Sequence, residues 1–357
     1  MFVANLYDIL LIKWPAFVGR APMPARRLAC FIAFPVAAQK KTRLTVYTAL
    51  ENEQLQPYKQ AAEAALKDIE IAWVRDSTGV ITARLLAEKS NPRADIIWGL
   101  SVFSLLQLQS QDMLEPYTPK GADRLRANFR SDRDPMTWTG MDAFASSICF
   151  NTMVAKQKSL PKPATWADLL DPAFKNQIVM PNPNSSGTGF LTVAGWIGEM
   201  GSDKAWDYMT RLNDNIAVYL HSGSAPCTNA ARGEYGVGIG LDMRAVELKN
   251  QGAPIEIIVP SDGVGYDLEG TAILKGTKKL SAARRLADFS VSPAAAKLYG
   301  RYYALLALSD VEPSIKGYPP AIAQSLVKAD FTAIAEKRAD ILKDWAARFD
   351  SKSAPKG

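Results

Sequence analysis

The sequence has little of the chemistry on which most enzymes depend. It contains a single histidine, His221, which excludes a conventional zinc site with two histidine ligands. A Ser-His-Asp triad would have to use this residue, and the Gly-x-Ser-x-Gly turn that often carries the serine is absent. The glycine-rich run 236–240 lacks the spacing of a dinucleotide fingerprint, and no Gly-Lys-Ser/Thr phosphate loop occurs. We therefore expect a protein that is not an enzyme and that uses no metal or cofactor.

Cysteine is also scarce. The three residues of this type are Cys30, Cys149 and Cys227, and their spacing does not fit a set of metal ligands. Cys30 falls within a predicted leader, which leaves two cysteines in the mature chain. Two cysteines in an exported protein are able to pair, but the sequence carries no information on their geometry. Whether Cys149 and Cys227 form a disulfide therefore stays open at this point.

Long apolar runs and a strong excess of one charge are missing as well. After residue 38 no segment reaches the ~20 apolar residues that cross a bilayer, so we expect a soluble mature protein. The formal net charge is +6, and half of it lies in the first 38 residues. The remaining basic residues are dispersed and are not interleaved with aromatic ones, which argues against nucleic-acid binding.

The first 38 residues are predicted to be a secretory signal peptide. Met23–Arg27 provides a positive start, residues 28–36 form a short apolar core, and Val36–Ala38 offers small residues for cleavage before Gln39. Residues 1–22 resemble an upstream extension, so translation is expected to start at Met1 or at Met23. The sequence before Cys30 is a poor lipoprotein cleavage box, because Arg27 is unfavourable there. We expect export to the periplasm.

The segment that follows the leader alternates between strand and helix patterns. Three β-branched or apolar runs are each followed by a helical pattern, which predicts an open, mostly parallel sheet. A second α/β block follows an extended run at 143–151, and a further extended run at 271–274 precedes several C-terminal helices. Residues 351–357 are predicted to be disordered. The first block consists of strands at 43–50, 69–74 and 94–98 and helices at 51–67, 77–89 and 99–113.

The stretch Pro181–Phe190 is the best candidate for a binding site. Its sequence, Pro-Asn-Pro-Asn-Ser-Ser-Gly-Thr-Gly-Phe, ends a short strand and begins a helix. Hydroxyl groups and the unpaired N–H groups of a first helical turn make such a junction suitable for an anion. An ordinary capped helix has the same pattern. A second hydroxyl-rich turn, 221–226, and the ends of the first three strands add further candidates, because ligands of open α/β sheets lie beyond the carboxyl ends of strands.

The order of these segments resembles the periplasmic solute-binding proteins of ABC importers, in the class that includes ferric-binding proteins. The resemblance covers residues 40–350 and rests on the Val-Tyr-Thr-Ala-Leu opening, the 181–189 turn and the Ser-Pro-Ala-Ala-Ala-Lys-Leu-Tyr helix. It implies a two-lobed α/β fold of the type II periplasmic-binding-protein kind, with two extended crossovers. The lobes are expected at 43–144 plus 268–350 and at 145–267, with a ligand trapped between them by hinge closure.

Ferric binders of this class carry adjacent tyrosines after the strand that corresponds to 237–241, where this chain has Asp242-Met243-Arg244. Tyr302-Tyr303 is adjacent but falls in a predicted C-terminal helix, where packing is the expected role. The stretches 238–247 and 264–272 are more similar to 2-aminoethylphosphonate-binding proteins. That resemblance implies that the 186–188 turn meets the phosphonate and that Asp267 and Glu269 meet the ammonium. A solvated pair at the hinge or a salt bridge is the alternative for these two carboxylates.

We therefore predict a monomeric binding protein that captures a small phosphonate zwitterion and delivers it to an ABC permease. The alternatives are a ferric ion, another small anion or a polyamine as ligand, and an enzyme on the same fold. The candidate ligand-binding residues are Tyr47, Thr48, Ser77, Thr78, Trp98, Ser101, Ser186, Gly187, Thr188, Ser222, Ser224, Asp242, Tyr266, Asp267 and Glu269.

Overall fold

The protein was analysed as a computed structural model that describes residues 41–328 and 330–355. The predicted signal peptide and Cys30 lie outside these residues. None of the helices within the described ranges is long and apolar enough to cross a membrane.

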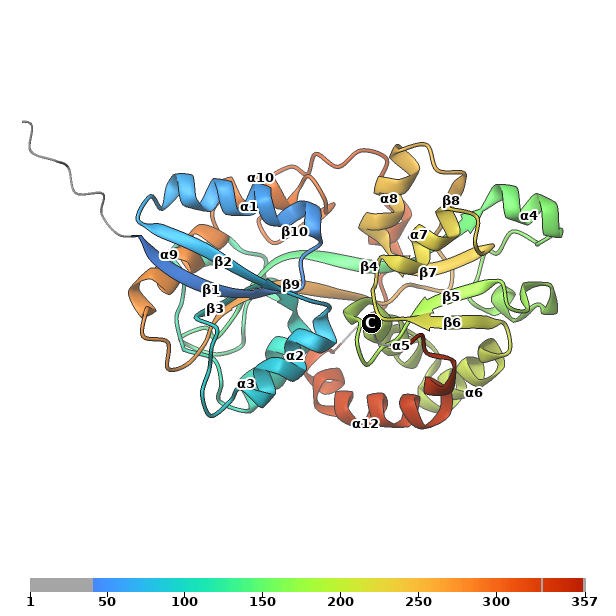
Figure 1. Cartoon of the computed structure of the whole chain (residues 1–357), viewed down its shortest axis with the longest axis horizontal. Coiled ribbons are helices and arrows are strands. Elements are labelled where there is room, and N and C mark those ends of the chain that lie inside the picture. Colours follow the sequence, from blue (N-terminus) through green and yellow to red (C-terminus); the bar gives the residue numbers. More distant parts are fainter. Residues whose placement is uncertain (1–40, 329, 356–357) are drawn as a thin grey trace, which may run out of the picture. The chain divides into compact units, whose positions relative to one another are not determined.

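The first block forms the predicted strand–helix alternation (Figure 1). β1 pairs in parallel with β2 on one side and with β3 on the other, as β-branched strands separated by helices are expected to do. One difference lies at Gly99–Ser101, which we predicted as a turn and which continues strand β3 with Gly99 at a φ of 80°. The elements are β1 (Thr42–Thr48), α1 (Asn52–Ala65), β2 (Ile69–Arg75), α2 (Thr78–Ala87), β3 (Ile96–Ser101) and α3 (Val102–Ser110).

The second block begins with β4 (Thr139–Asn151), a strand whose 13 residues are all buried. Residues 139–145 of β4 pair with β9, and residues 146–150 pair with β7, so this strand runs between both blocks. The other elements are α4 (Thr152–Lys158), β5 (Ile178–Pro181), α5 (Gly187–Met200), α6 (Ser202–Asn213), β6 (Ile216–Leu220), α7 (Ala225–Ala231), β7 (Val237–Leu241), α8 (Asp242–Asn250) and β8 (Ile255–Ile258).

The chain returns through β9 (Tyr266–Ile273), which lies between β3 and β4. Within the described residues ten strands form one sheet in the order β2-β1-β3-β9-β4-β7-β5-β6, and β8 and β10 also pair with β4. β4 and β9 are thus the two extended crossovers that the sequence predicts. The remaining elements are α9 (Leu280–Ser290), α10 (Pro293–Tyr299), β10 (Leu305–Leu306), α11 (Pro320–Gln324) and α12 (Phe331–Phe349).

Two large hydrophobic cores lie along this sheet, but they do not follow the predicted lobe boundaries throughout. The first contains most apolar residues of 44–143 and 268–311, and the second those of 145–264. Ile322, Trp345 and Phe349, from the segment expected in lobe 1, are buried in the second core. Phe190 of α5 packs edge-to-face on Phe103 in the first core. Helices α5 and α12 therefore contact both cores. The lobe boundaries stay a prediction.

Two features near the second core resolve questions that the sequence left open. Cys149 in β4 and Cys227 in α7 form a disulfide, and both residues are fully buried. The segment after α12, predicted to be disordered, is instead ordered over residues 350–354. It forms a short 3-10 turn at Asp350–Lys352, and Ala354 N donates to Tyr219 O at 2.9 Å beside β6. Main-chain pairing with a strand outweighs the weak local preferences of Ser, Lys and Ala.

Candidate functional site

A small cavity of about 40 Å³ lies at the carboxyl ends of the strands, where the two blocks meet. Its wall combines residues from β2, the starts of α1, α2 and α5, the turn before α7, and both crossovers. The lining residues are Ala49, Glu51, Arg75, Ser77, Thr78, Phe144, Ser186, Gly187, Thr188, Ser222, Gly223, Leu241, Glu269 and Tyr303.

Two helices begin at this cavity, and residues at their starts, Thr78 of α2 and Gly187 and Thr188 of α5, line it. α2 begins after Ser77, and α5 begins after Ser186, whose Oγ accepts a hydrogen bond from Gly189 N at 3.3 Å. The two starts are in close contact: Gly79 N donates to Ser185 O at 2.9 Å, and a Cβ on Gly79 would lie 2.1 Å from Asn184 O. Only glycine permits this approach. The helix ends and their hydroxyl groups form a wall suited to an anion.

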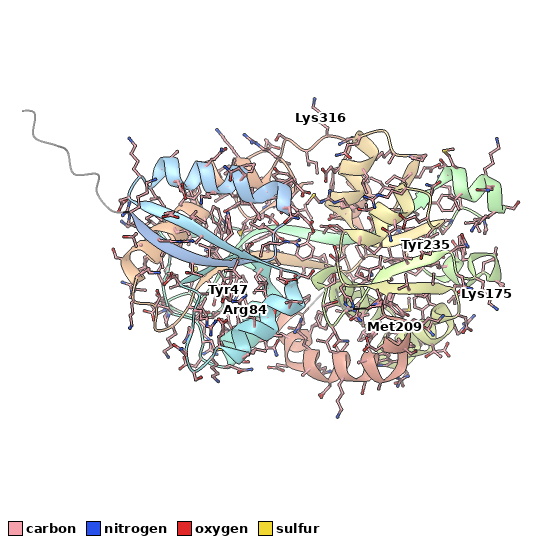
Figure 2. The ribbon with its side chains drawn as sticks, viewed as in Figure 1. Tyr47, Arg84, Lys175, Met209, Tyr235 and Lys316 are labelled. Atoms are coloured by element: carbon pink, nitrogen blue, oxygen red, sulfur yellow. A yellow bond between two sulfur atoms is a disulfide. The ribbon has the colours of Figure 1, made fainter. Side chains whose placement is uncertain are left out.

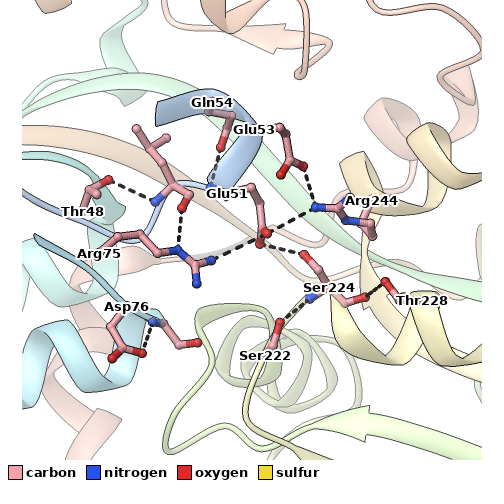
Figure 3. Close-up of polar contacts among 12 residues, drawn as sticks. Thr48, Glu51, Glu53, Gln54, Arg75, Asp76, Ser222, Ser224, Thr228 and Arg244 are labelled. Atoms are coloured by element: carbon pink, nitrogen blue, oxygen red, sulfur yellow. Dashed lines mark hydrogen bonds and ion pairs between the residues drawn. The ribbon is translucent and has the colours of Figure 1, made fainter. Parts of the chain in front are cut away.

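Arg75, the last residue of β2, adds a positive charge to this wall. Its Nε donates to Leu50 O at 2.9 Å, which orients the guanidinium, and its Nη2 lies 3.6 Å from Glu51 Oε2. Figure 3 shows the Arg75 and Glu51 side chains directed towards each other above the 222–224 turn. A guanidinium with several remaining N–H donors is suited to phosphate-type oxygens.

A polar network that includes the lining residue Glu51 joins the start of α1 to α7 and α8 (Figure 3). Ser224 Oγ donates to Glu51 Oε1 at 2.7 Å. Arg244 Nη2 lies 2.5 Å from Glu53 Oε1 and 3.3 Å from Glu51 Oε2, and its Nη1 lies 2.5 Å from Glu247 Oε2. Because Glu51 and Glu53 come from the first block and Ser224 and Arg244 from the second, the network joins the two blocks.

The opposite wall is acidic. Glu269 in β9 lines the cavity with 7% of its surface exposed, and its Oε2 has no hydrogen-bond partner among the described residues. Asp142 lies opposite it in the β4–β9 ladder, is fully buried, and has both carboxylate oxygens unpartnered within the same residues. Burial raises the pKa of Glu269 to about 8; the charge of Glu51 also raises it, while a hydrogen bond with Tyr303 opposes this effect. Burial, followed by the charge of Glu269, raises the pKa of Asp142 well above its usual range.

These carboxyl groups predict a pH dependence for the empty protein. The native state retains a proton on Glu269 that the unfolded state loses near the ordinary pKa of 4.5. The native state therefore binds more protons between about pH 4.5 and 8, and the free energy of unfolding should fall as the pH rises through this window. We expect Glu269→Gln to flatten that fall in urea denaturation curves measured across the window. Glu256→Gln, at a side chain 43% exposed, is the control, and equal slopes for all three proteins would contradict this expectation.

Seven of the residues predicted from the sequence meet at this cavity, although they come from distant parts of the chain. They are Ser77, Thr78, Ser186, Gly187, Thr188, Ser222 and Glu269. Four others, Ser101, Ser224, Asp242 and Asp267, do not line the cavity and are bound to other residues of the protein. Ser224 binds Glu51, and Ser101 Oγ donates to Asp267. Asp242 begins α8 and accepts from Tyr318 Oη at 2.7 Å. Burial raises the pKa of Asp267 to about 7.

The structure does not bring the other four predicted residues to the cavity. Tyr47 lies under the Arg84 guanidinium at 5.0 Å and donates to Glu88 (Figure 2). Thr48 Oγ1 donates to Gly99 O, which secures β1 against β3. Trp98 is fully buried with its Nε1 donating to Tyr299 Oη at 2.9 Å. Tyr266 packs edge-to-face on Phe331. Residues next to one another along a strand point to opposite faces, so a strand end alone does not decide which side chain meets a ligand.

Several lining residues are not among those predicted from the sequence. Arg75 ends β2, and Glu51 stands between β1 and α1. Ligands of open α/β sheets lie beyond the carboxyl ends of strands, so the same rule that selected Ser77 also indicates these two residues. Tyr303 was expected to pack within a C-terminal helix, but α10 ends at Tyr299. Tyr303 is buried, its hydroxyl accepts from Gln54 Nε2 at 3.2 Å, and it also lines the cavity. In the described part of the chain, no group of three or more His, Cys, Asp or Glu side chains is placed to hold a metal ion.

This fold and interlobe cavity define a two-lobed binding protein of the type II periplasmic class. Residues 91–319 match the family of bacterial extracellular solute-binding proteins, and the chain belongs to that family. An uncharacterised protein of Haemophilus influenzae is 30% identical over 89% of this chain and 94% of its own length. A periplasmic-binding protein of an ABC transporter from Sinorhizobium fredii is 25% identical over 89% of this chain and 87% of its length.

A third relative, from Salmonella typhi, bears a name that refers to periplasmic 2-aminoethylphosphonate binding; it is 24% identical over 84% of this chain and 90% of its length. Among solved structures, AfuA of Actinobacillus pleuropneumoniae with exogenous fructose-6-phosphate bound has a TM-score of 0.81 and 29% identity, covering 86% of this chain and 98% of AfuA. Iron-bound HitA of Pseudomonas aeruginosa, at 18% identity, a TM-score of 0.72 and coverage of 85% and 99%, shares the fold alone. The chain is thus a solute-binding protein of an ABC importer.

Proposed function

We propose that the ligand is a small organic phosphate or phosphonate, captured between the lobes and released to an ABC permease. The observation that carries this proposal is the anion wall: the starts of α2 and α5, the Ser222–Gly223 turn and the Arg75 guanidinium face one cavity. Three tetrahedral oxygens require several N–H and O–H donors, and this wall provides them with a single positive charge. We place the protein in the periplasm as a monomer.

Glu269 determines which chemical group the ligand carries besides its phosphate or phosphonate. Glu269 Oε2 needs a hydrogen-bond donor, since no other described group supplies one. The ammonium of 2-aminoethylphosphonate is such a donor, and a cation beside Glu269 and Asp142 would relieve the cost of burying two adjacent carboxyl groups. The Salmonella relative named for this compound supports it as the first candidate.

A hexose phosphate is the second candidate, favoured by the higher identity to AfuA, whose structure holds fructose-6-phosphate. Its hydroxyl groups are donors as well, and Glu269 in its protonated form accepts a hydrogen bond without needing a cation. The two candidates share the anion wall and differ in the charge at Glu269.

Calorimetry and thermal shift with a ligand panel test the proposal. The panel contains 2-aminoethylphosphonate, ethylphosphonate, which lacks the ammonium, fructose-6-phosphate, inorganic phosphate and ferric citrate. We expect at least one phosphorus compound with a donor group to bind more tightly than ethylphosphonate. The proposal is wrong if none of the four phosphorus compounds gives heat or a thermal shift while ferric citrate does. Glu269→Gln should weaken an ammonium ligand and leave a hexose phosphate largely unaffected.

A further inference from the structure

We propose that segment 350–354, acting through Asn182 and His221, positions the turn that binds the ligand's anion. We call residues 182–189 the anion turn. The proposal rests on the proposed function for its effect on affinity, whereas its effect on the order of the turn does not depend on any ligand. Asn182 and His221 are positioning residues, because neither lines the cavity.

Asn182 joins the beginning of the anion turn to the segment. Its Nδ2 donates to Asp350 Oδ1 at 3.0 Å and to Ser353 Oγ at 2.8 Å. Its Oδ1 accepts from Asn184 N at 2.8 Å, and its carbonyl accepts from Ser186 N at 2.9 Å. The side chain is 2% exposed, so water does not readily replace these bonds. Fixing the Asn182 amide therefore fixes the path of the chain up to Ser186, which caps α5.

His221 makes a second connection on the other side of the turn. Its Nε2 lies 2.8 Å from Ala354 O, and its Nδ1 lies 2.9 Å from Ser185 Oγ. A carbonyl only accepts, so Nε2 carries the hydrogen, and in the neutral ring Nδ1 accepts from the Ser185 hydroxyl. The only histidine of the chain thus bridges the segment and the anion turn.

The segment itself is held firmly enough to serve as a support. Ala354 N donates to Tyr219 O at 2.9 Å, and Lys352 Nζ donates to Asn213 O at 2.5 Å and to Ile216 O at 2.9 Å. Trp345 and Phe349, at the end of α12, are buried in the second core next to it. The support is therefore anchored in the same block as β6.

His221 and Ser185 also contact the first block, at the start of α2. Ser77 Oγ donates to His221 O at 2.9 Å, and Gly79 N donates to Ser185 O at 2.9 Å. These bonds join the start of α2 to His221, which the segment contacts, and to Ser185, which His221 contacts. A displaced anion turn would therefore weaken both the anion wall and the contacts between the blocks.

Two shortened chains test the proposal directly. A chain that ends at Lys352 loses the Ser353 and Ala354 contacts, whereas a chain that ends at Ala354 retains all of them and is the matched control. In hydrogen exchange without ligand, we expect the amides of Ser185, Ser186 and Gly189 to exchange about tenfold faster in the chain that ends at Lys352 than in the full chain, as the loss of one or two hydrogen bonds implies. The chain that ends at Ala354 should exchange at the rate of the full chain. Equal exchange at these amides in both chains would overturn the proposal.

Two substitutions of His221 provide a second test in case the shortened chain folds poorly. Asparagine reaches the position of Nδ1 and glutamine that of Nε2, so His221→Asn retains the Ser185 bond and His221→Gln retains the Ala354 bond. We expect each to weaken the affinity for the tightest phosphorus compound of the panel about threefold to tenfold, with an unfolding temperature close to wild type. Wild-type affinity in both variants would overturn the proposal. Failure of every compound to bind the wild type would refute the proposed function instead. In that case hydrogen exchange in the same variants still decides the role of segment 350–354.

Discussion

Replacement of Arg75 by alanine is expected to lower the affinity for a phosphate or phosphonate ligand about 100-fold or more. Arg75 supplies the only side-chain positive charge that lines the cavity within the described residues. Charge-assisted hydrogen bonds contribute about 1.5–3 kcal/mol each, and a guanidinium makes two to one tetrahedral anion. Loss of the charge also leaves Glu51 with one cation fewer, and a less neutralised carboxylate beside the anion weakens binding further. Isothermal titration calorimetry against the tightest compound of the panel measures the change.

Arg75→Lys and Arg43→Ala separate the possible causes. Lysine retains the charge but loses the planar pair of donors, so we expect an intermediate loss. Arg43 has a side chain that is 70% exposed and pairs on the surface with Glu70, and it carries the same change in net charge. Wild-type affinity of Arg75→Ala, or an equal loss in Arg43→Ala, would show that long-range charge rather than the Arg75 contact attracts the ligand.

Removal of the disulfide is expected to lower the free energy of unfolding by about 2–4 kcal/mol. The bond joins residues 78 positions apart, so its loss frees a long loop in the unfolded chain. It also connects β4 with α7, and α7 follows the Ser222–Ser224 turn of the cavity wall. Urea denaturation of Cys149→Ala/Cys227→Ala beside the wild type measures the effect.

A reducing agent provides the control for this prediction. It should destabilise the wild type to about the level of the double variant and leave the double variant unchanged. A double variant as stable as the oxidised wild type would contradict the prediction. We also expect the double variant, once folded, to bind the panel compounds with affinity close to wild type, because neither cysteine lines the cavity.

Much of the fold follows from local patterns in the sequence. β-branched runs separated by helical patterns define the parallel strands of the first block, and the extended runs predicted at 143–151 and 271–274 belong to the two crossovers, β4 and β9. Hydroxyl-rich junctions such as 186–188 were identified because N-cap residues and glycines act on their own backbone, within a few positions. For the same reason the sequence alone predicts that Ser77, Thr78 and Ser222 lie at the carboxyl ends of the strands.

The sequence by itself determined most strands, the starts of α2 and α5, and therefore the hydroxyl-bearing part of the cavity wall. Tertiary structure decided the rest, because it depends on contacts between segments far apart in the chain. The pairing of β4 with β9 places Asp142 opposite Glu269, and the end of α10 at Tyr299 brings Tyr303 to the cavity. The disulfide and the ordered segment 350–354 belong to the same category. Their short-range sequence is ordinary, and their structure comes from hydrogen bonds and burial that only the folded chain provides.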